Sequence, residues 1–125
     1  MGWQGPAEVD RELSDAWALA APSLWAEPLG LVAIEAIIRG VPVIASREGG
    51  LAETVDPGRT GLLFANGDED ALLECLRSVA IGAVFPSRVL DADAVRRIAD
   101  RHDYGRHVEH LQRIYQSVRT PGVLL

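Results

Sequence analysis

The sequence contains no lysine, and all twelve of its basic residues are arginine. Chemistry that needs a lysine ammonium must therefore come from another chain or another segment. The single cysteine, Cys75, excludes an intramolecular disulfide and a cysteine-based zinc site. No apolar run approaches the roughly 18 residues of a membrane span, and no signal segment is recognisable. We therefore expect no membrane span and a cytoplasmic location.

Positive charge is also scarce. The 18 acidic residues outnumber the 12 basic ones, which gives a formal net charge of −6. Nucleic-acid binding relies on clustered cations, so we expect no nucleic-acid partner. A small anionic ligand remains compatible with an acidic protein, because a helix N-terminus supplies local positive potential.

Alternation of short apolar runs with helical periodicity predicts an α/β fold. The first run, 17–22, is wholly apolar and ends in proline, which is typical of a strand buried on both faces. Two further strands are expected at 41–45 and 61–64. Helical crossovers between consecutive strands make the strands parallel. We expect helices over 6–16, 30–39, 51–55, 68–80, 91–101 and 104–118, with Asp68 as an N-cap and Gly40 as a left-handed C-terminal cap.

The loop 23–29 leads from the first strand into the helix at Gly30. In α/β sheets, ligands bind at the carboxyl ends of the strands, where such loops lie. The free amides of Gly30, Leu31 and Val32 would point at an anion such as a diphosphate, and the helix dipole favours it. Gly30 carries no Cβ, so the backbone can approach a ligand closely.

Two glutamates flank this helix start. Glu35 lies inside the strongly apolar segment 31–38, where an unpaired buried carboxylate is costly. We therefore expect Glu35 to face the crevice at the carboxyl ends of the strands and not solvent. In that crevice, the two hydroxyls of a sugar diol could donate hydrogen bonds to its carboxylate. Alternatively, it holds a backbone N–H or Arg39 one turn on. Glu27 lies at the lip of the crevice, or it is simply an acid stabilised by the helix dipole.

Two other features each leave two interpretations open. The pair Gly49-Gly50 alone is a turn more often than a ligand cradle. His107 and His110 are three residues apart on one helix face, with His102 nearby. A metal site there is conceivable, but the stretch has the pattern of a solvated helix face, so we expect no metal.

Taken together, these motifs resemble the family 4 retaining glycosyltransferases of the two-Rossmann-domain (GT-B) type, also called glycosyl transferases group 1. The signature of that family is two glutamates separated by seven residues, and Glu27 and Glu35 match it. The resemblance covers nearly the whole chain. It is carried by Glu27-Pro28-Leu29-Gly30, Glu35-Ala36, the run 40–46, Gly49-Gly50, Glu53, the run 61–63, Gly67-Asp68, Tyr104 and Tyr115.

The resemblance implies an enzyme that binds a UDP-, GDP- or ADP-sugar and transfers the sugar with retention of configuration, without a cofactor or an obligatory metal. Glu27 would contact the sugar and is the catalytic candidate. Leu29, Gly30 and Leu31 would bind sugar and diphosphate through their amides, and Glu35 would bind the ribose hydroxyls. The weaker candidates for donor binding are Val32, Gly49 and Gly50.

The resemblance also implies that residues 1–125 form only the second half of a Rossmann-like doubly wound sheet, with C-terminal helices. In the family, an arginine and a lysine from the first half of this domain also hold the diphosphate. A preceding acceptor domain supplies a catalytic histidine. We therefore expect no activity from this chain alone. The alternatives are a non-catalytic remnant and, less favoured, a GT-B-fold nucleotide-sugar epimerase, which would not use the Glu27 and Glu35 pattern.

In the Rossmann strand order 3-2-1-4-5-6, the three strands would be the fourth, fifth and sixth. The strand near Trp17–Ala21 would then lack its inner neighbour. It would expose an apolar edge that no lysine or bulge protects. We expect this edge to cause a homodimer, a complex with the other half, or aggregation.

Overall fold

The structure, a computed structural model, describes residues 2–118. Its three strands are β1 (Leu19–Ala21), β2 (Val43–Ser46) and β3 (Gly61–Phe64). They form one parallel sheet in the order β1-β2-β3. The predicted three-stranded parallel α/β fold with C-terminal helices is thereby confirmed.

Residues 2–118 also form six α-helices and one 3-10 turn. Three of the described helices begin with an aspartate N-cap. The Asp68 side chain accepts from the Ala71 amide at 2.9 Å, as predicted, Asp91 accepts from the Ala94 amide at 2.7 Å, and Asp103 accepts from the Arg106 amide at 2.8 Å. No described helix combines the length and the apolar character needed to cross a membrane. The elements are α1 (Pro6–Asp15), α2 (Leu31–Ile38), α3 (Gly49–Thr54), α4 (Glu69–Ala80), η1 (Pro86–Arg88), α5 (Ala92–Arg101) and α6 (Tyr104–Val118).

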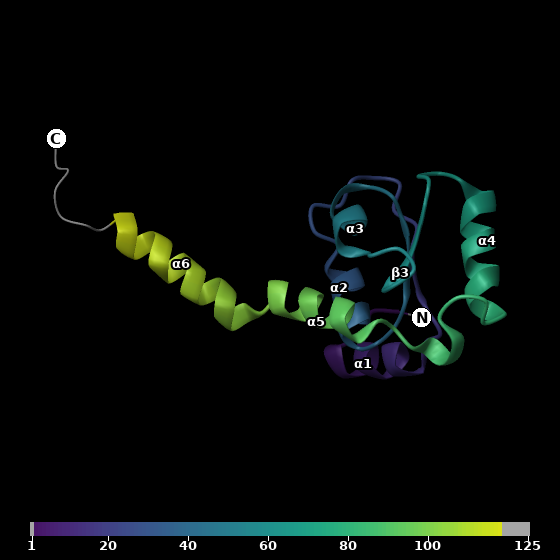
Figure 1. The fold of residues 1–125 in the computed structure, drawn as a ribbon, viewed down its shortest axis with the longest axis horizontal. Helices are drawn as coiled ribbons and strands as arrows, with labels where there is room; N and C mark the ends of the chain where they lie inside the picture. Colours follow the sequence, from purple (N-terminus) through teal and green to yellow (C-terminus); the bar gives the residue numbers. More distant parts are fainter. Residues whose placement is uncertain (1, 119–125) are drawn as a thin grey trace.

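Side chains that alternate along the strands build two cores. Val43 and Ala45 pack with residues of α1, α2 and α3 on one face of the sheet. Ile44 and Phe64 pack with Val79 of α4 on the other face. Figure 1 shows this layering, with α2 and α3 on one side of β3 and α4 on the other. β2 is central, and all four of its residues are buried.

The expectation that the first strand is buried on both faces is wrong. Ala21 of β1 is buried, but Ala20 is exposed and the preceding Trp17 is 58% exposed. β1 is an edge of the sheet, and among residues 2–118 only β2 pairs with it. The helix on the Ala20 face, α4, packs on β2 and β3. The apolar sequence of β1 therefore remains partly uncovered.

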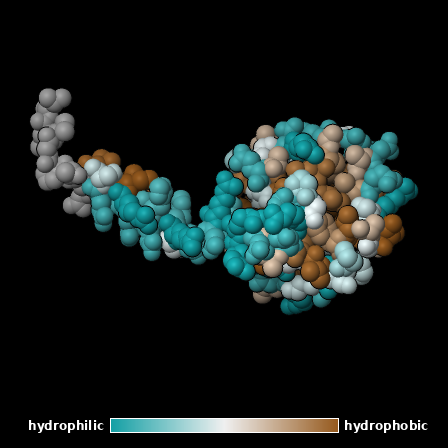
Figure 2. Space-filling view, viewed as in Figure 1, coloured by the Kyte–Doolittle hydropathy of each residue, from teal (hydrophilic) through white to brown (hydrophobic). Residues whose placement is uncertain are grey.

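The helix α6 extends away from the rest of the chain (Figure 1). Its predicted apolar face is present but lies open. Leu111, Ile114, Tyr115 and Val118 are all exposed, and only Val108 is half-buried. Figure 2 shows apolar atoms near the far end of this helix. The helical spacing thus predicted the face correctly, while nothing described packs against it.

Candidate functional site

The loop between β1 and α2 is anchored to the carboxyl ends of the two other strands. Ser46, the last residue of β2, donates its hydroxyl to the Ser23 carbonyl at 2.7 Å. Asn66, just after β3, donates its side-chain amide to the Leu24 carbonyl at 3.3 Å. The loop therefore lies at the sheet edge where the sequence predicts a ligand site.

The glycine pair Gly49-Gly50 brings α3 directly against this loop. The Gly50 amide donates to the Glu27 carbonyl at 2.6 Å. A Cβ on Gly49 would lie 2.4 Å from the Glu27 carbonyl oxygen, and one on Gly50 would lie 2.5 Å from Leu29 Cα. Both distances are too short for any side chain. Because its amide is already engaged, Gly50 acts here by positioning the loop.

The start of α2 leaves backbone amides open. Gly30 is buried and left-handed, with φ 69°, and a Cβ there would lie 2.8 Å from Leu51 Cδ2. No side chain caps the helix. The Gly30 carbonyl accepts from the Ala33 amide at 3.0 Å, so the amides of Leu31 and Val32 are the first ones without a partner inside the helix. Such a terminus favours an anion.

Glu27 is half-buried, and its carboxylate has a defined partner. The Ser23 hydroxyl donates to Glu27 Oε1 at 2.5 Å. With the carbonyl held by Gly50, both the main chain and the side chain of Glu27 are fixed to the fold.

The expectation that Glu35 is shielded from solvent is wrong, because Glu35 is exposed. The helix α2 buries one face, through Ala33, Ile34, Ala36 and Ile37, and its other face has nothing described against it. Leu31 and Val32, 62% and 40% exposed, share this outer face with Glu35. Glu35 thus lies one turn beyond Leu31, on the face that continues from the open amides.

The alternative that Arg39 neutralises Glu35 does not hold either. The Arg39 guanidinium pairs with Asp10, with Nε at 2.9 Å from Oδ1. It also donates to the main-chain carbonyl of Glu35 at 2.8 Å, rather than to the carboxylate. The Glu35 carboxylate therefore remains available on the surface.

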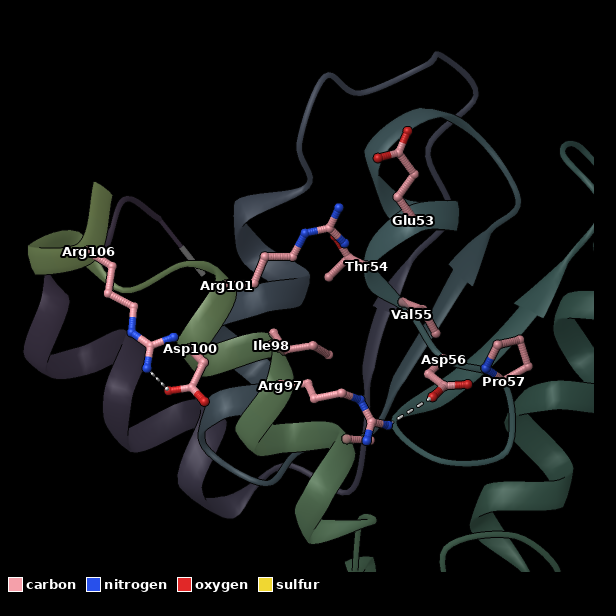
Figure 3. Close-up of a pocket in the computed structure, with 11 residues that line it drawn as sticks. Glu53, Thr54, Val55, Asp56, Pro57, Arg97, Ile98, Asp100, Arg101 and Arg106 are labelled. Carbon is pink, nitrogen blue, oxygen red and sulfur yellow. Dashed lines mark ion pairs between the residues drawn. The ribbon is translucent and has the colours of Figure 1, made fainter. Parts of the chain in front are cut away.

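A cavity of about 650 Å³ lies elsewhere, between α3, α5 and the start of α6 (Figure 3). Its lining includes none of residues 27–35. Arg97 lies 3.8 Å from Asp56 and Arg106 lies 3.7 Å from Asp100, while Arg101 extends from α5 toward α3. Arginines and acids balance around this cavity, so it has no strong preference for an anion.

The comparisons with known proteins identify the family of the chain. Residues 1–87 match the sequence profile of the family described as Glycosyl transferases group 1. The chain belongs to this family. Over 104 residues it is 32% identical to the phosphatidyl-myo-inositol mannosyltransferase of Mycobacterium leprae, which covers 82% of this chain and 27% of that protein.

Two solved structures match the group 1 chain along nearly its full length. Sucrose-phosphate synthase from Thermosynechococcus elongatus superposes with a TM-score of 0.83 and 32% identity, covering 98% of this chain and 30% of that one. Anabaena HepE, solved in complex with UDP-glucose, shares the fold at a TM-score of 0.72 and 23% identity, covering 94% and 31%. The chain therefore spans about a quarter to a third of the length of these proteins.

Several polar residues at the loop are not predicted as site residues from the sequence. Ser23, Ser46 and Asn66 hold the loop, and Arg47 lies exposed directly after β2. The available signal is that Ser46, Arg47 and Asn66 lie at or just beyond the carboxyl ends of strands, where side chains converge in a parallel sheet. Among residues 2–118, His102, His107 and His110 do not gather with other side chains into a set that could hold a metal ion.

The ion pair between Arg59 and Asp91 joins the turn before β3 to α5. Arg59 Nη2 lies 2.9 Å from Asp91 Oδ1. The Ala94 amide, and then the Arg59 guanidinium, hold the pKa of Asp91 below its ordinary value. The hydrogen bond to Asp91 in turn raises the pKa of Arg59. Neither residue belongs to the loop 23–29, so the pair is a contact of the scaffold and not of the candidate site.

Proposed function

We propose that residues 23–35 bind the nucleotide-sugar donor of a retaining glycosyltransferase. The observation that carries the proposal is the uncapped N-terminus of α2, which follows the left-handed Gly30 in a loop anchored at the carboxyl ends of β2 and β3. A helix N-terminus at this edge of a parallel sheet suits a diphosphate. The donor classes that fit are UDP-, GDP- and ADP-sugars.

Each part of the loop has a separate role in this proposal. The backbone of Leu29, Gly30 and Leu31, with Val32 as a weaker contributor, binds the sugar and the diphosphate. Glu27 accepts hydrogen bonds from the sugar hydroxyls. Glu35, one turn further along the outer face of α2, accepts them from the ribose. A diol that donates to a carboxylate forms charge-assisted hydrogen bonds, which are the stronger kind.

The same geometry supports departure of the diphosphate. Negative charge grows on the leaving diphosphate as the bond to the sugar breaks, and preorganised amides at a helix N-terminus stabilise such charge. The reaction we propose retains the anomeric configuration, with the donor phosphate assisting the acceptor. Glu27 contributes by orienting the sugar. No cofactor takes part in this scheme.

We further propose that the working enzyme contains more than this chain. The relatives are three to four times longer, and the acceptor domain and a cationic part of the donor site would lie in the remainder. The exposed edge of β1 suits one occupant in particular, a parallel strand with its own helix. That occupant would cover Ala20 and Trp17, which the fold leaves exposed.

Two conservative variants test the donor assignment, because each removes the carboxylate assigned to a different part of the donor, Glu27 to the sugar and Glu35 to the ribose. Binding of a nucleoside diphosphate and of the corresponding nucleotide sugar is measured by nuclear magnetic resonance for the wild type, Glu27→Gln and Glu35→Gln. We expect Glu35→Gln to weaken both ligands, since both contain ribose. Glu27→Gln should weaken only the nucleotide sugar. Equal effects of the two variants on both ligands would refute the assignment.

A further inference from the structure

We propose that Ser23 is a positioning residue for the donor sugar, because its hydroxyl fixes the carboxylate of Glu27. The inference rests on the proposed function and extends it by one residue. Ser23 Oγ lies 2.5 Å from Glu27 Oε1, and Ser23 is itself half-buried. Ser23 would act through Glu27 and would not touch the donor.

The position of Ser23 is determined by the sheet. Its carbonyl accepts from the Ser46 hydroxyl at 2.7 Å, and Ser46 is 1% exposed at the end of the central strand β2. A buried residue in a central strand is among the least mobile parts of a fold. The contacts therefore run without a break from the rigid sheet, through Ser46 and Ser23, to the Glu27 carboxylate.

Glu27 needs this restraint because its main chain alone does not orient it. The Gly50 amide holds the Glu27 carbonyl at 2.6 Å, but three side-chain torsions separate that backbone from the carboxylate. A glutamate side chain has among the largest rotamer entropies of any residue. A hydrogen bond that selects one rotamer before the donor arrives removes this ordering step from binding.

The hydrogen bond also leaves the carboxylate able to bind. Ser23 engages Oε1, and the described residues give Oε2 no partner. An ionised carboxylate has about four acceptor positions, so several remain for sugar hydroxyls. In this proposal Oε1 serves to orient the group, while Oε2 accepts hydrogen bonds from the sugar hydroxyls.

A hydrogen bond from Ser23 to Glu27 that only stabilises the loop would look the same in the structure. The test must therefore separate an effect on stability from an effect on sugar recognition. The informative variants are Ser23→Ala, which removes the hydroxyl, and Ser23→Thr, which keeps it. The matched control is Ser14→Ala, where an exposed serine of α1 loses a local hydrogen bond to the Asp10 carbonyl. All four proteins are compared by thermal unfolding.

The first readout needs no ligand. Three-bond couplings measured by nuclear magnetic resonance report the rotamers of Glu27. We expect one dominant rotamer in the wild type, in Ser23→Thr and in Ser14→Ala, and averaged couplings in Ser23→Ala. The second readout is the ratio of the Kd for a nucleoside diphosphate to the Kd for its nucleotide sugar, taken for UDP, GDP and ADP with their glucose or mannose forms.

For Ser23→Ala we expect this ratio to fall by roughly threefold to tenfold, with the Kd of the diphosphate unchanged. Ser23→Thr should restore the ratio. The inference is overturned if Glu27 is already averaged in the wild type, or if Ser23→Ala changes only the thermal stability. If no nucleotide affects the amides of residues 29–32 in the wild type, the proposed function itself fails, and the sugar role of Ser23 fails with it.

Discussion

The Gly50 amide lies 2.6 Å from the Glu27 carbonyl, so α3 starts directly against the loop that carries the proposed sugar ligand. The loop is thereby held from three sides, by Gly50 in α3, by Ser46 at the end of β2 and by Asn66 after β3. The geometry of Glu27 depends on elements that are distant in the sequence. Substitutions at these anchors should therefore disturb donor binding without touching the donor.

Gly50→Ala should move the loop. The added Cβ would lie 2.5 Å from Leu29 Cα, which is backbone and cannot rotate away. We expect a loss of about 1–3 kcal/mol in the free energy of unfolding, as is typical of overpacking. We also expect amide chemical shifts to change across residues 27–31. Denaturant unfolding and two-dimensional spectra measure these two effects.

Gly58→Ala is the matched control. Gly58 is left-handed, with φ 77°, and has nothing within 4 Å of its Cβ position. It should lose roughly 1–2 kcal/mol from backbone strain alone. Shifts in residues 27–31 that are equally large in both variants would contradict the specific role of Gly50.

Asp91→Asn should alter the response of stability to acid. The folded-state pKa of Asp91 lies below its unfolded value of about 3.9. The ionised carboxylate therefore contributes fully to the free energy of unfolding when the pH is above the unfolded-state pKa. This contribution is lost as the pH falls through the folded-state pKa. Asparagine keeps the N-cap but removes the charge. Urea unfolding from pH 7 to pH 3 should show the wild type more stable near neutrality and the two curves converging in acid. A difference in the free energy of unfolding between the two proteins that stays the same from pH 7 to pH 3 would contradict this prediction.

Ala20→Lys should suppress self-association. Ala20 is exposed on the open edge strand β1, and an edge lysine discourages strand pairing. Light scattering at high micromolar concentration should show species larger than one chain for the wild type and a single chain for the variant. Ala65→Lys, an exposed position beyond β3, carries the same charge and should behave like the wild type. A monomeric wild type would remove the basis for a partner at this edge.

The 125-residue chain alone should turn over no donor and bind nucleoside diphosphate weakly. The proposed site offers backbone amides and two carboxylates, and the chain contains no lysine. The family resemblance places two further cations on the diphosphate. Charge-assisted contacts contribute roughly 1.5–3 kcal/mol each, so lacking two raises Kd on the order of a hundredfold or more. Assays for donor hydrolysis and transfer check this, and turnover by the pure chain would contradict it.

Local patterns predicted the elements well, because their causes are local. The run 61–64 became β3 and Asp68 became an N-cap, since strand propensity and capping depend on neighbouring residues. The exposure of Glu35 and Ala20 was not predictable in this way. Burial depends on what packs against a face. Apolar composition alone does not reveal that, among the described residues, no element packs against the faces that carry Glu35 and Ala20. The contacts of Ser23 and Ser46 could likewise not be predicted from the sequence, because they depend on how the three strands are arranged.

The most direct test of the central claim is whether a diphosphate binds at the N-terminus of α2. Amide chemical shifts of the chain are recorded during titration with UDP, with GDP and ADP in parallel, and with uridine as the control that lacks phosphates. We expect saturable shifts centred on the amides of Leu29, Gly30, Leu31 and Val32 for at least one diphosphate, and none for uridine. Shifts confined to the cavity residues Arg97, Arg101 and Arg106, or no shifts with any diphosphate, would contradict it.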